Sequence, residues 1–417
     1  MKPVEFVIIG AGSRGGCYAD FALKNPSIAK LIGIAEPRAE LRDRYASQHE
    51  LLPGNVFQDW RELAAQERMA DAVVISTLDA MHCEPAIAFA NQGYNLMLEK
   101  PMATTLDDCR RIVETVDRTG VTMAVGHVLL YTEYTQRLRQ IMSDGTIGKI
   151  VSVQHLEPVG YWHQAHSFVR GNWRNDSDSS SMLLAKSCHD LDWIRYVVDQ
   201  PCVAVSSFGN LSHFRREEKP IEAGDATRCV DCDHESQCPY SAKRIYLDRV
   251  RDGETGWPVD VVTLDTTESG VNRAIADGEY GRCVYECDNN VVDNQVVSME
   301  FEEGITANLT MTAFTSAGPR RTSIFGTLGE IRGNGSTIEI NHFLNDETTI
   351  IQVEDSNAFE LGQHNLGDDA LMTAFFEAVA TGDKSHLLSG PRQTLESHSI
   401  VFAAEQARRE GMVVRLD

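Results

Sequence analysis

A glycine-rich turn follows the first apolar run of the chain. Residues 4–9 (VEFVII) lead directly into Gly10-Ala11-Gly12-Ser13-Arg14-Gly15, which has the spacing G-x-G-x-x-G. In this spacing the first glycine permits a tight turn, the second lets the backbone approach a pyrophosphate, and the third lets the next helix pack on the strand. The N–H groups that begin that helix would face the phosphates. The turn therefore predicts a dinucleotide site, to which we assign Gly10, Gly12, Ser13, Arg14 and Gly15.

A titratable side chain lies at the end of a later apolar run, in Glu99-Lys100-Pro101. In an open α/β sheet, ligands bind at this edge. Hydride transfer to or from a carbinol carbon requires a proton to join or leave the oxygen, and a lysine near a cationic nicotinamide can have the lowered pKa that suits this step. We therefore predict that Lys100 is catalytic, that Glu99 and Pro101 fix its direction, and that Glu99 and Lys100 also contact the cofactor.

An acidic residue ends the second apolar run, in Ile34-Ala35-Glu36-Pro37-Arg38. A carboxylate at this position accepts hydrogen bonds from the adenosine ribose hydroxyls and repels a 2′-phosphate. Glu36 therefore favours NAD, whereas Arg38 could accommodate the phosphate of NADP. We expect NAD, with NADP as the alternative, and a solvated turn residue is the non-functional interpretation of Glu36.

An aromatic segment, residues 157–174, mixes two His, two Trp, one Tyr and two Arg. Aromatic faces stack on the C–H surfaces of sugars, while Arg, His and Asn bind hydroxyls or a carboxylate. We predict that the segment lines a carbohydrate pocket, with Glu157, His163, Arg170 and Trp173 as the candidate contacts. The alternative is a lid or an interface between subunits, because Trp, Tyr and Arg are also enriched at interfaces.

Cysteines cluster in a polar part of the chain. Cys229, Cys232 and Cys238 have the spacing C-x₂-C-x₅-C, and Cys283 follows in the same region. Thiolates at this spacing bind tetrahedral zinc, and a segment without its own core gains most from a metal. We predict a structural zinc held by these four, with Cys287 and His234 as substitute ligands. Partly buried thiols are the alternative, and an iron–sulfur cluster is a weaker one.

The elements that would position these residues alternate over the first 125 or so residues. Apolar runs lie at 4–9, 30–35, 72–76, 95–98 and 121–125, and amphipathic segments lie at 14–24, 38–49, 83–92 and 105–119. This alternation predicts an α/β domain over residues 1–126, with a doubly wound parallel sheet of the Rossmann type. Thr105 or Thr104, with an acid three residues later, predicts a capped helix start, and Gly120 a helix end.

The pattern changes after Gly126. Strand-like runs at 149–157, 202–209, 295–302, 305–313, 321–326 and 348–353 alternate in several places between apolar and polar residues. This alternation favours an antiparallel sheet with one buried face, hence an α+β domain over residues 127–417. Helices are expected at 132–143, 189–198, 366–381 and 391–410, and a final strand at 412–416. Residues 213–285 are polar and poorly periodic, which indicates an insertion.

Composition restricts the possible partners. The chain has 417 residues and a formal net charge of −23. The length suits two domains, and the charge argues against nucleic acid or an anionic membrane as a partner. No apolar run is long enough to span a bilayer, and Met1-Lys2-Pro3 leads directly into the first strand, so we expect no signal peptide and a cytoplasmic location.

Several motifs together resemble the Gfo/Idh/MocA oxidoreductase family. They are the glycine turn, residues 75–82 (ISTLDAMH), Glu99-Lys100-Pro101, residues 145–150 (GTIGKI) and residues 326–330 (GTLGE), so the resemblance covers nearly the whole chain. It implies a large, open, mostly antiparallel sheet in the second domain and assembly as a homodimer or homotetramer. It also implies cofactor contacts by Thr77 and His82, a substrate-binding or proton-relaying role for His189, and a pocket role for His364 before Gly367-Asp368.

One position departs from the family pattern. The family places an Asp four residues before the histidine that matches His189, and this chain has Ala185 there, followed by Lys186. Lys186 could substitute as a polar contact, although its charge is opposite. Asp192 could orient the histidine or its helix, or it could simply be an acid in the first helical turn. His127, just after the fifth strand, is expected at the edge of the pocket.

Three functions compete on these residues. The first is an NAD(P)-dependent dehydrogenase that acts on a hydroxyl or carbonyl carbon of a sugar, inositol or related polyol. The second is a glycoside hydrolase that oxidises the sugar transiently with bound NAD and reduces it again. The third is a dinucleotide-binding protein without catalysis that senses redox state.

Overall fold

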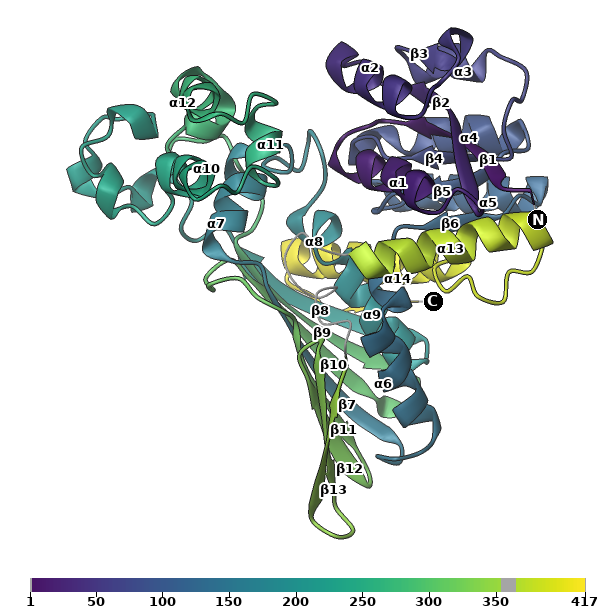
Figure 1. Ribbon diagram of the computed structural model, residues 1–417. Coiled ribbons are helices and arrows are strands. Elements are labelled where there is room, and N and C mark those ends of the chain that lie inside the picture. Colours follow the sequence, from purple (N-terminus) through teal and green to yellow (C-terminus); the bar gives the residue numbers. More distant parts are fainter. Residues whose placement is uncertain (1, 354–364, 417) are drawn as a thin grey trace.

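The computed structural model describes residues 2–353 and 365–416, which contain two β-sheets (Figure 1). The first sheet is parallel, in the order β3-β2-β1-β4-β5-β6. Its strands are β1 (Val4–Ile9), β2 (Ala29–Ala35), β3 (Val56–Phe57), β4 (Ala72–Ile75), β5 (Asn95–Leu98) and β6 (Met123–Val125). The strand order reverses between β1 and β4, which is where such a sheet binds its ligand. The predicted Rossmann sheet is confirmed, and the two-residue β3, too short to show a pattern, was missed.

Helices cover this sheet, four of them at the predicted places and one, over residues 60–64, that was not predicted. They are α1 (Ser13–Lys24), α2 (Ala39–Gln48), α3 (Trp60–Ala64), α4 (Cys83–Asn91) and α5 (Leu106–Thr119). The capping signals explain the bounds of α5. The Thr105 hydroxyl accepts a hydrogen bond from the Asp108 N–H at 3.1 Å, and Gly120 ends the helix with φ +73°.

The second sheet has the order β14-β13-β12-β11-β7-β10-β9-β8-β15. Its strands are β7 (Ile150–Pro158), β8 (Cys202–Asn210), β9 (Asn294–Phe301), β10 (Thr306–Thr312), β11 (Arg321–Gly326), β12 (Gly329–Gly333), β13 (Thr337–His342), β14 (Glu347–Gln352) and β15 (Val414–Arg415). Only β7 and β10 run parallel, so the predicted mostly antiparallel sheet is confirmed. Helices α6 (Glu133–Ser143) and α9 (Cys188–Val198) lie on one face (Figure 1).

Strands β12 and β13 were missed in the sequence. Strand β12 begins and ends with a glycine. Between them Glu330 and Arg332 are charged, so Ile331 is the one buried apolar side chain of the strand. Gly329, expected only as part of a turn, is the first residue of the strand. The pairing of β12 with β11 and β13 therefore depends on neighbouring strands more than on local propensity.

Helix α13 (Asn365–Thr381) belongs to the core of the first sheet, although it follows the second sheet in the chain (Figure 1). The Phe376 ring centroid lies 5.0 Å from that of Phe6 and 5.9 Å from that of Phe21. Helix α14 (Pro391–Glu410) packs against both α5 and β8. The two C-terminal helices therefore join the two sheets into one rigidly packed body.

The predicted insertion forms a helical lobe between β8 and β9, seen at the upper left of Figure 1. It contains α10 (Asp248–Arg251), α11 (Val259–Val262) and α12 (Glu268–Asp277). Its core, which includes Ile245, Tyr246 and Val271, also takes in Ala165 and Val169 from the aromatic segment. Throughout the part of the chain that the structure describes, no helix combines the length and apolar character needed to cross a membrane.

Candidate active site

The glycine turn has the geometry of a dinucleotide cradle. Gly10 has φ +83°, and a Cβ placed there would lie 2.7 Å from the Ser76 carbonyl oxygen. A Cβ on Gly15 would lie 2.0 Å from the Gly10 carbonyl oxygen, so only glycine fits at either position. Helix α1 then begins at Ser13 without an acidic residue in its first turn. Its first N–H groups are therefore suited to phosphate, and the turn fits NAD or NADP.

Arg14 binds two carboxylates of the protein itself. Its Nε donates to Glu99 Oε1 at 2.7 Å, and its Nη1 donates to Asp368 Oδ2 of α13 at 3.0 Å. The Tyr18 hydroxyl completes the group through contacts with Arg14 and Glu99. Arg14 therefore joins α1, the end of β5 and α13, and its charge is already balanced where a phosphate contact was predicted.

Glu36 lies at the carboxyl end of β2, as predicted, and its side chain is 1% exposed. Its carboxylate accepts hydrogen bonds from the Ala11 N–H at 2.7 Å and from Arg38 Nε at 2.7 Å. Burial raises the pKa of Glu36, but these bonds outweigh burial and leave the pKa below its usual value. Glu36 thus stays charged beside the glycine turn and holds Arg38, the residue that would otherwise meet a 2′-phosphate.

Lys100 lies just after β5, at the edge of the first sheet where the second domain begins to cover it. Its Nζ donates to the Ala185 carbonyl oxygen at 2.5 Å. Ala185 ends the short helix α8 (Met182–Ala185) and is the position where the family has its Asp. The partner of Lys100 Nζ at this position is therefore a backbone carbonyl and not a carboxylate.

The Lys100 backbone is held from both sides. The Glu99 carboxylate accepts from the Lys100 N–H at 2.9 Å, and the arginine and lysine charges beside it outweigh burial and lower the Glu99 pKa to about 2. The Lys100–Pro101 bond is cis. His82 contacts the Pro101 carbonyl at 2.7 Å through Nδ1 and the Thr77 carbonyl at 3.2 Å through Nε2. His82 and Thr77 therefore brace this loop, next to the site where cofactor contacts were predicted.

Three histidine rings pack edge to face beside Lys100. The His127 centroid lies 5.6 Å from those of His189 and His398. Burial, followed by the charge of Lys100, lowers the His127 pKa to about 3, so its imidazole is neutral. Asp192 lies behind them, with Oδ2 at 3.9 Å from His127 Nδ1 and Oδ1 at 3.6 Å from Arg195 Nε. Burial raises the Asp192 pKa. His398, from α14, was not predicted.

A buried ionic network extends from this group into the second sheet. Lys186 Nζ lies 3.2 Å from Glu157 Oε1, and Arg320 Nε lies 3.0 Å from Glu157 Oε2. Arg320 also pairs with Asp190, whose Oδ1 is 3.1 Å from His155 Nε2. Lys186 and Glu157 were predicted separately, and the structure pairs them. Arg320, Asp190 and His155 were missed, because no local motif distinguishes them from ordinary surface charges.

The aromatic segment folds into α7 (Tyr161–His163) and the π-helix η4 (Gln164–Arg170). His163 is 8% exposed, and burial and the charge of Lys186 place its pKa well below the usual value. Trp173 Nε1 contacts both oxygens of Asp79 at 3.1 Å, which ties the segment to the first domain. Asp79, within residues 75–82, had no assigned role in the sequence.

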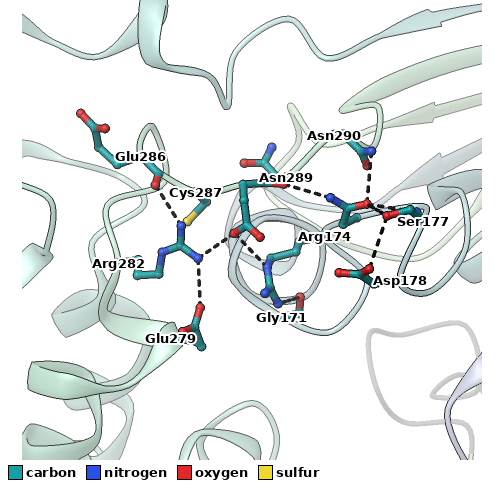
Figure 2. A network of polar contacts seen from close by, with 12 residues as sticks. Gly171, Arg174, Ser177, Asp178, Glu279, Arg282, Glu286, Cys287, Asn289 and Asn290 are labelled. Carbon is teal, nitrogen blue, oxygen red and sulfur yellow. Dashed lines mark hydrogen bonds and ion pairs between the residues drawn. The ribbon is translucent and has the colours of Figure 1, made fainter.

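Figure 2 shows how the end of this segment is fixed to the insertion. Arg174 Nε donates to Asp288 Oδ1 at 3.0 Å, and Arg282 Nη1 donates to the same oxygen at 2.7 Å. Asn290 extends the network through a bond of its N–H to the Arg174 carbonyl at 2.9 Å. The insertion therefore supports the end of the aromatic segment.

Arg170 departs from the prediction that it binds substrate. It is 1% exposed, and it donates to the carbonyls of Arg282 at 2.7 Å and Tyr240 at 2.8 Å and to Cys229 Sγ at 3.4 Å. These acceptors belong to the insertion, so the guanidinium points into the lobe and not toward Lys100. His364 lies outside the described residues.

The zinc prediction is not supported. Cys229, Cys232, Cys238 and Cys283 do line one cavity of about 20 Å³. Among residues 2–353 and 365–416, however, no three side chains of His, Cys, Asp or Glu are placed to hold a metal ion. Cys229 Sγ is directed to Arg170 and accepts from the Ala242 N–H at 3.4 Å, while Cys287 Sγ donates to the Cys283 carbonyl at 3.3 Å.

The fold and the site define a dinucleotide-binding protein with a lysine at the sheet edge and a second domain that covers it. The chain belongs to the Gfo/Idh/MocA oxidoreductase family: residues 4–127 match its NAD-binding Rossmann fold and residues 139–416 its C-terminal alpha/beta domain.

The individual proteins that match this chain have low sequence identity to it. A 2,7-anhydro-N-acetylneuraminate hydratase of Mediterraneibacter gnavus is 27% identical over 214 residues, 51% of this chain and 54% of the relative. A glycosyl hydrolase family 109 protein of Phocaeicola vulgatus is 23% identical over 189 residues, 44% of this chain and 34% of the relative. The chain thus spans about half the length, or less, of these two curated relatives. A levoglucosan dehydrogenase solved with NADH and levoglucosan has the same fold, with a TM-score of 0.70, 17% identity and 99% of each chain covered.

Proposed function

We propose that the protein is an NAD(P)-dependent oxidoreductase that transfers hydride between the nicotinamide and a carbinol or carbonyl carbon of a sugar or related polyol. The observation that carries the proposal is the position of Lys100 Nζ, which is 2.5 Å from the Ala185 carbonyl and beside the buried, neutral His127. The relatives with dehydrogenase and sugar-related names support the substrate class.

The residues around Lys100 have separate roles in this reaction. When bound, the cofactor supplies the hydride acceptor or donor. Lys100 takes the proton from the substrate oxygen at Nζ, or returns it in the reverse direction. The Ala185 carbonyl directs that nitrogen, and His189, at the start of α9, would bind the same oxygen or relay the proton. The covering domain excludes water from the reacting atoms.

The preferred cofactor in this proposal is NAD. The buried, charged Glu36 suits the ribose hydroxyls, and its hydrogen bonds to Arg38 occupy the nearest cation. NADP binding would require Arg38 to leave this partner.

The first experiment is a panel of sugars, inositols, polyols and their acids, incubated with NAD or NADP and followed at the NADH absorbance. We expect at least one substrate to be oxidised faster with NAD than with NADP. The same panel run with Lys100→Ala should show turnover lowered by at least about 10²-fold. Wild-type turnover by that variant would contradict the role of Lys100.

A glycoside hydrolase with transient oxidation is the second candidate, and the likeness to a family 109 glycosyl hydrolase favours it. This reaction releases sugar from an aryl glycoside without net accumulation of NADH. Hydrolysis of an aryl glycoside that depends on added NAD would therefore replace the dehydrogenase proposal.

We also propose that the protein assembles as a homodimer or homotetramer through the open face of the second sheet. Phe208 and Val296, which pair across β8 and β9 on that face, are 74% and 36% exposed. Light scattering would test the assembly. The ten free thiols support a reducing, cytoplasmic location, which cell fractionation would test.

A further inference from the structure

The site holds a second ammonium group that the chemistry above does not use. Lys186 Nζ belongs to a side chain 15% exposed, and among the described residues its one paired acceptor is the Glu157 carboxylate at 3.2 Å. An ammonium group has three N–H donors, so Lys186 keeps donors for a ligand. Lys100 likewise has a single acceptor, the Ala185 carbonyl. The two lysines are close enough for each charge to act on the other.

The carboxylates of this region are already taken. Glu157 is shared between Lys186 and Arg320, and Asp190 is shared between Arg320 and His155. The other buried acids are directed elsewhere: Glu99 to Arg14, Asp192 to Arg195, and Asp79 to Trp173 and Ser180. Among the described residues, the Glu157 carboxylate is thus shared by two cations, Lys186 and Arg320, and Lys100 Nζ has no carboxylate partner.

The departure at Ala185 strengthens this imbalance. Where the family has an Asp that can accept hydrogen bonds from substrate hydroxyls, this chain has a methyl group followed by a cation. A pocket with free donors and occupied acceptors suits a ligand group that only accepts, and a carboxylate is such a group.

We propose that Lys186 selects a substrate that carries a carboxylate, such as an aldonic or uronic acid, over the neutral sugar or polyol. The inference rests on the proposed function for the identity of the reacting hydroxyl. The carboxylate would bind at Lys186, away from the carbon that exchanges hydride near Lys100, so that Lys186 determines specificity and Lys100 moves the proton.

Matched pairs of ligands test the proposal. Binding of D-gluconate and D-glucitol, D-galactonate and galactitol, and D-glucuronate and D-glucose to the NAD-loaded protein is measured by calorimetry. The wild type should bind the acid at least about tenfold more tightly in one or more pairs, as expected for a charge-assisted contact. Lys186→Met should lose this preference, because it should weaken binding of the acid more than binding of the neutral ligand, and Lys186→Arg should keep most of it.

The variants are chosen to keep the fold. In Lys186→Met the Glu157 carboxylate retains Arg320 as its partner, and Lys149→Met at an exposed site is the control for a lost lysine charge. An acid preference that survives in Lys186→Met, equal binding within every pair, or no binding of any acid overturns the inference. Acid-selective binding without NADH formation would instead overturn the proposed function and leave the inference standing.

Discussion

At the scale of single residues, the site depends on which partner each charged group has found. Lys100 pairs with a backbone carbonyl. Glu99 pairs with Arg14, and Glu36 pairs with Arg38, which lies two residues after it. The pairings of Glu99 and Glu36 lower the pKa of each acid and keep both carboxylates charged, and each pairing can be changed by one substitution.

Replacement of Lys100 by Met should lower turnover by about 10²- to 10⁴-fold, the usual contribution of a general acid–base group. NADH binding should change little, because the glycine turn is untouched. Stopped-flow hydride transfer and fluorescence titration with NADH separate the two effects, and Lys149→Met is the matched control. An equal loss of both would show that Lys100 serves the cofactor only.

Replacement of Glu36 by Ala should weaken NAD binding by about tenfold to a hundredfold, since a charged acceptor for the ribose is lost. Arg38 would be released at the same time, so affinity for NADP should rise. Dissociation constants for both cofactors measure the switch. Unchanged discrimination would identify Glu36 as a structural turn residue.

Glu99 should make stability depend on pH in the acid range. Its pKa is lowered from 4.5 to about 2 in the folded protein, so its stabilising contribution is complete above about pH 4.5 and is lost as the pH falls toward 2. Glu99→Gln should be less stable at pH 7, and its free energy of unfolding should fall less steeply between pH 4.5 and 3. Urea unfolding at several pH values measures both. Identical slopes in the two proteins would contradict the lowered pKa.

At the scale of elements, helix α13 decides whether the first sheet is complete. It comes last but one among the helices, yet its Phe375 and Phe376 fill the face beside Phe6. The same helix carries Asp368, which holds Arg14 beneath the glycine turn. Packing of α13 therefore supports the cofactor site directly.

Phe376→Ala should lower the free energy of unfolding by about 3–5 kcal/mol, because a fully buried ring is removed from three aromatic contacts. NADH affinity should fall with it as α13 loosens. Chemical denaturation measures the first effect, with Phe343→Ala, which removes a ring 59% exposed, as the control. Equal stability of the two variants would mean that α13 does not complete this core.

At the scale of the whole molecule, the insertion supports the aromatic segment, which we propose lines the substrate site. Asn210 and Asn294, which flank it, are direct neighbours in the sheet, so the lobe leaves and returns at one point. Its core encloses Val169 of the aromatic segment, and Arg282 with Arg174 ties the two together.

Replacement of residues 213–288 by a short turn should therefore keep NADH binding while turnover falls by about tenfold or more, since the aromatic segment loses its support. Circular dichroism and NADH titration establish that the remainder is folded. Full turnover by the shortened protein would show that the insertion is not needed to position the aromatic segment.

The sequence predicted the fold closely because the signals involved are local. The glycine turn, the alternation of apolar and amphipathic segments, and the caps Thr105 and Gly120 each act within a few residues. The strands and helices that were not predicted lack such local signals. Strands β3 and β12 are too short or too polar to form a pattern, and the helices of the insertion contain four to ten residues.

The amino-acid sequence by itself determined the nucleotide-binding class, the family and the position of Lys100 at the sheet edge. Only the tertiary structure decided the partners of the charged side chains. Arg14 pairs with a residue 354 positions away, Lys100 with a carbonyl 85 positions away, and Arg170 with the insertion. Such contacts depend on which elements meet in space, and no spacing along the chain encodes them. The physical reason is that a charge removed from water must find a partner wherever the fold supplies one.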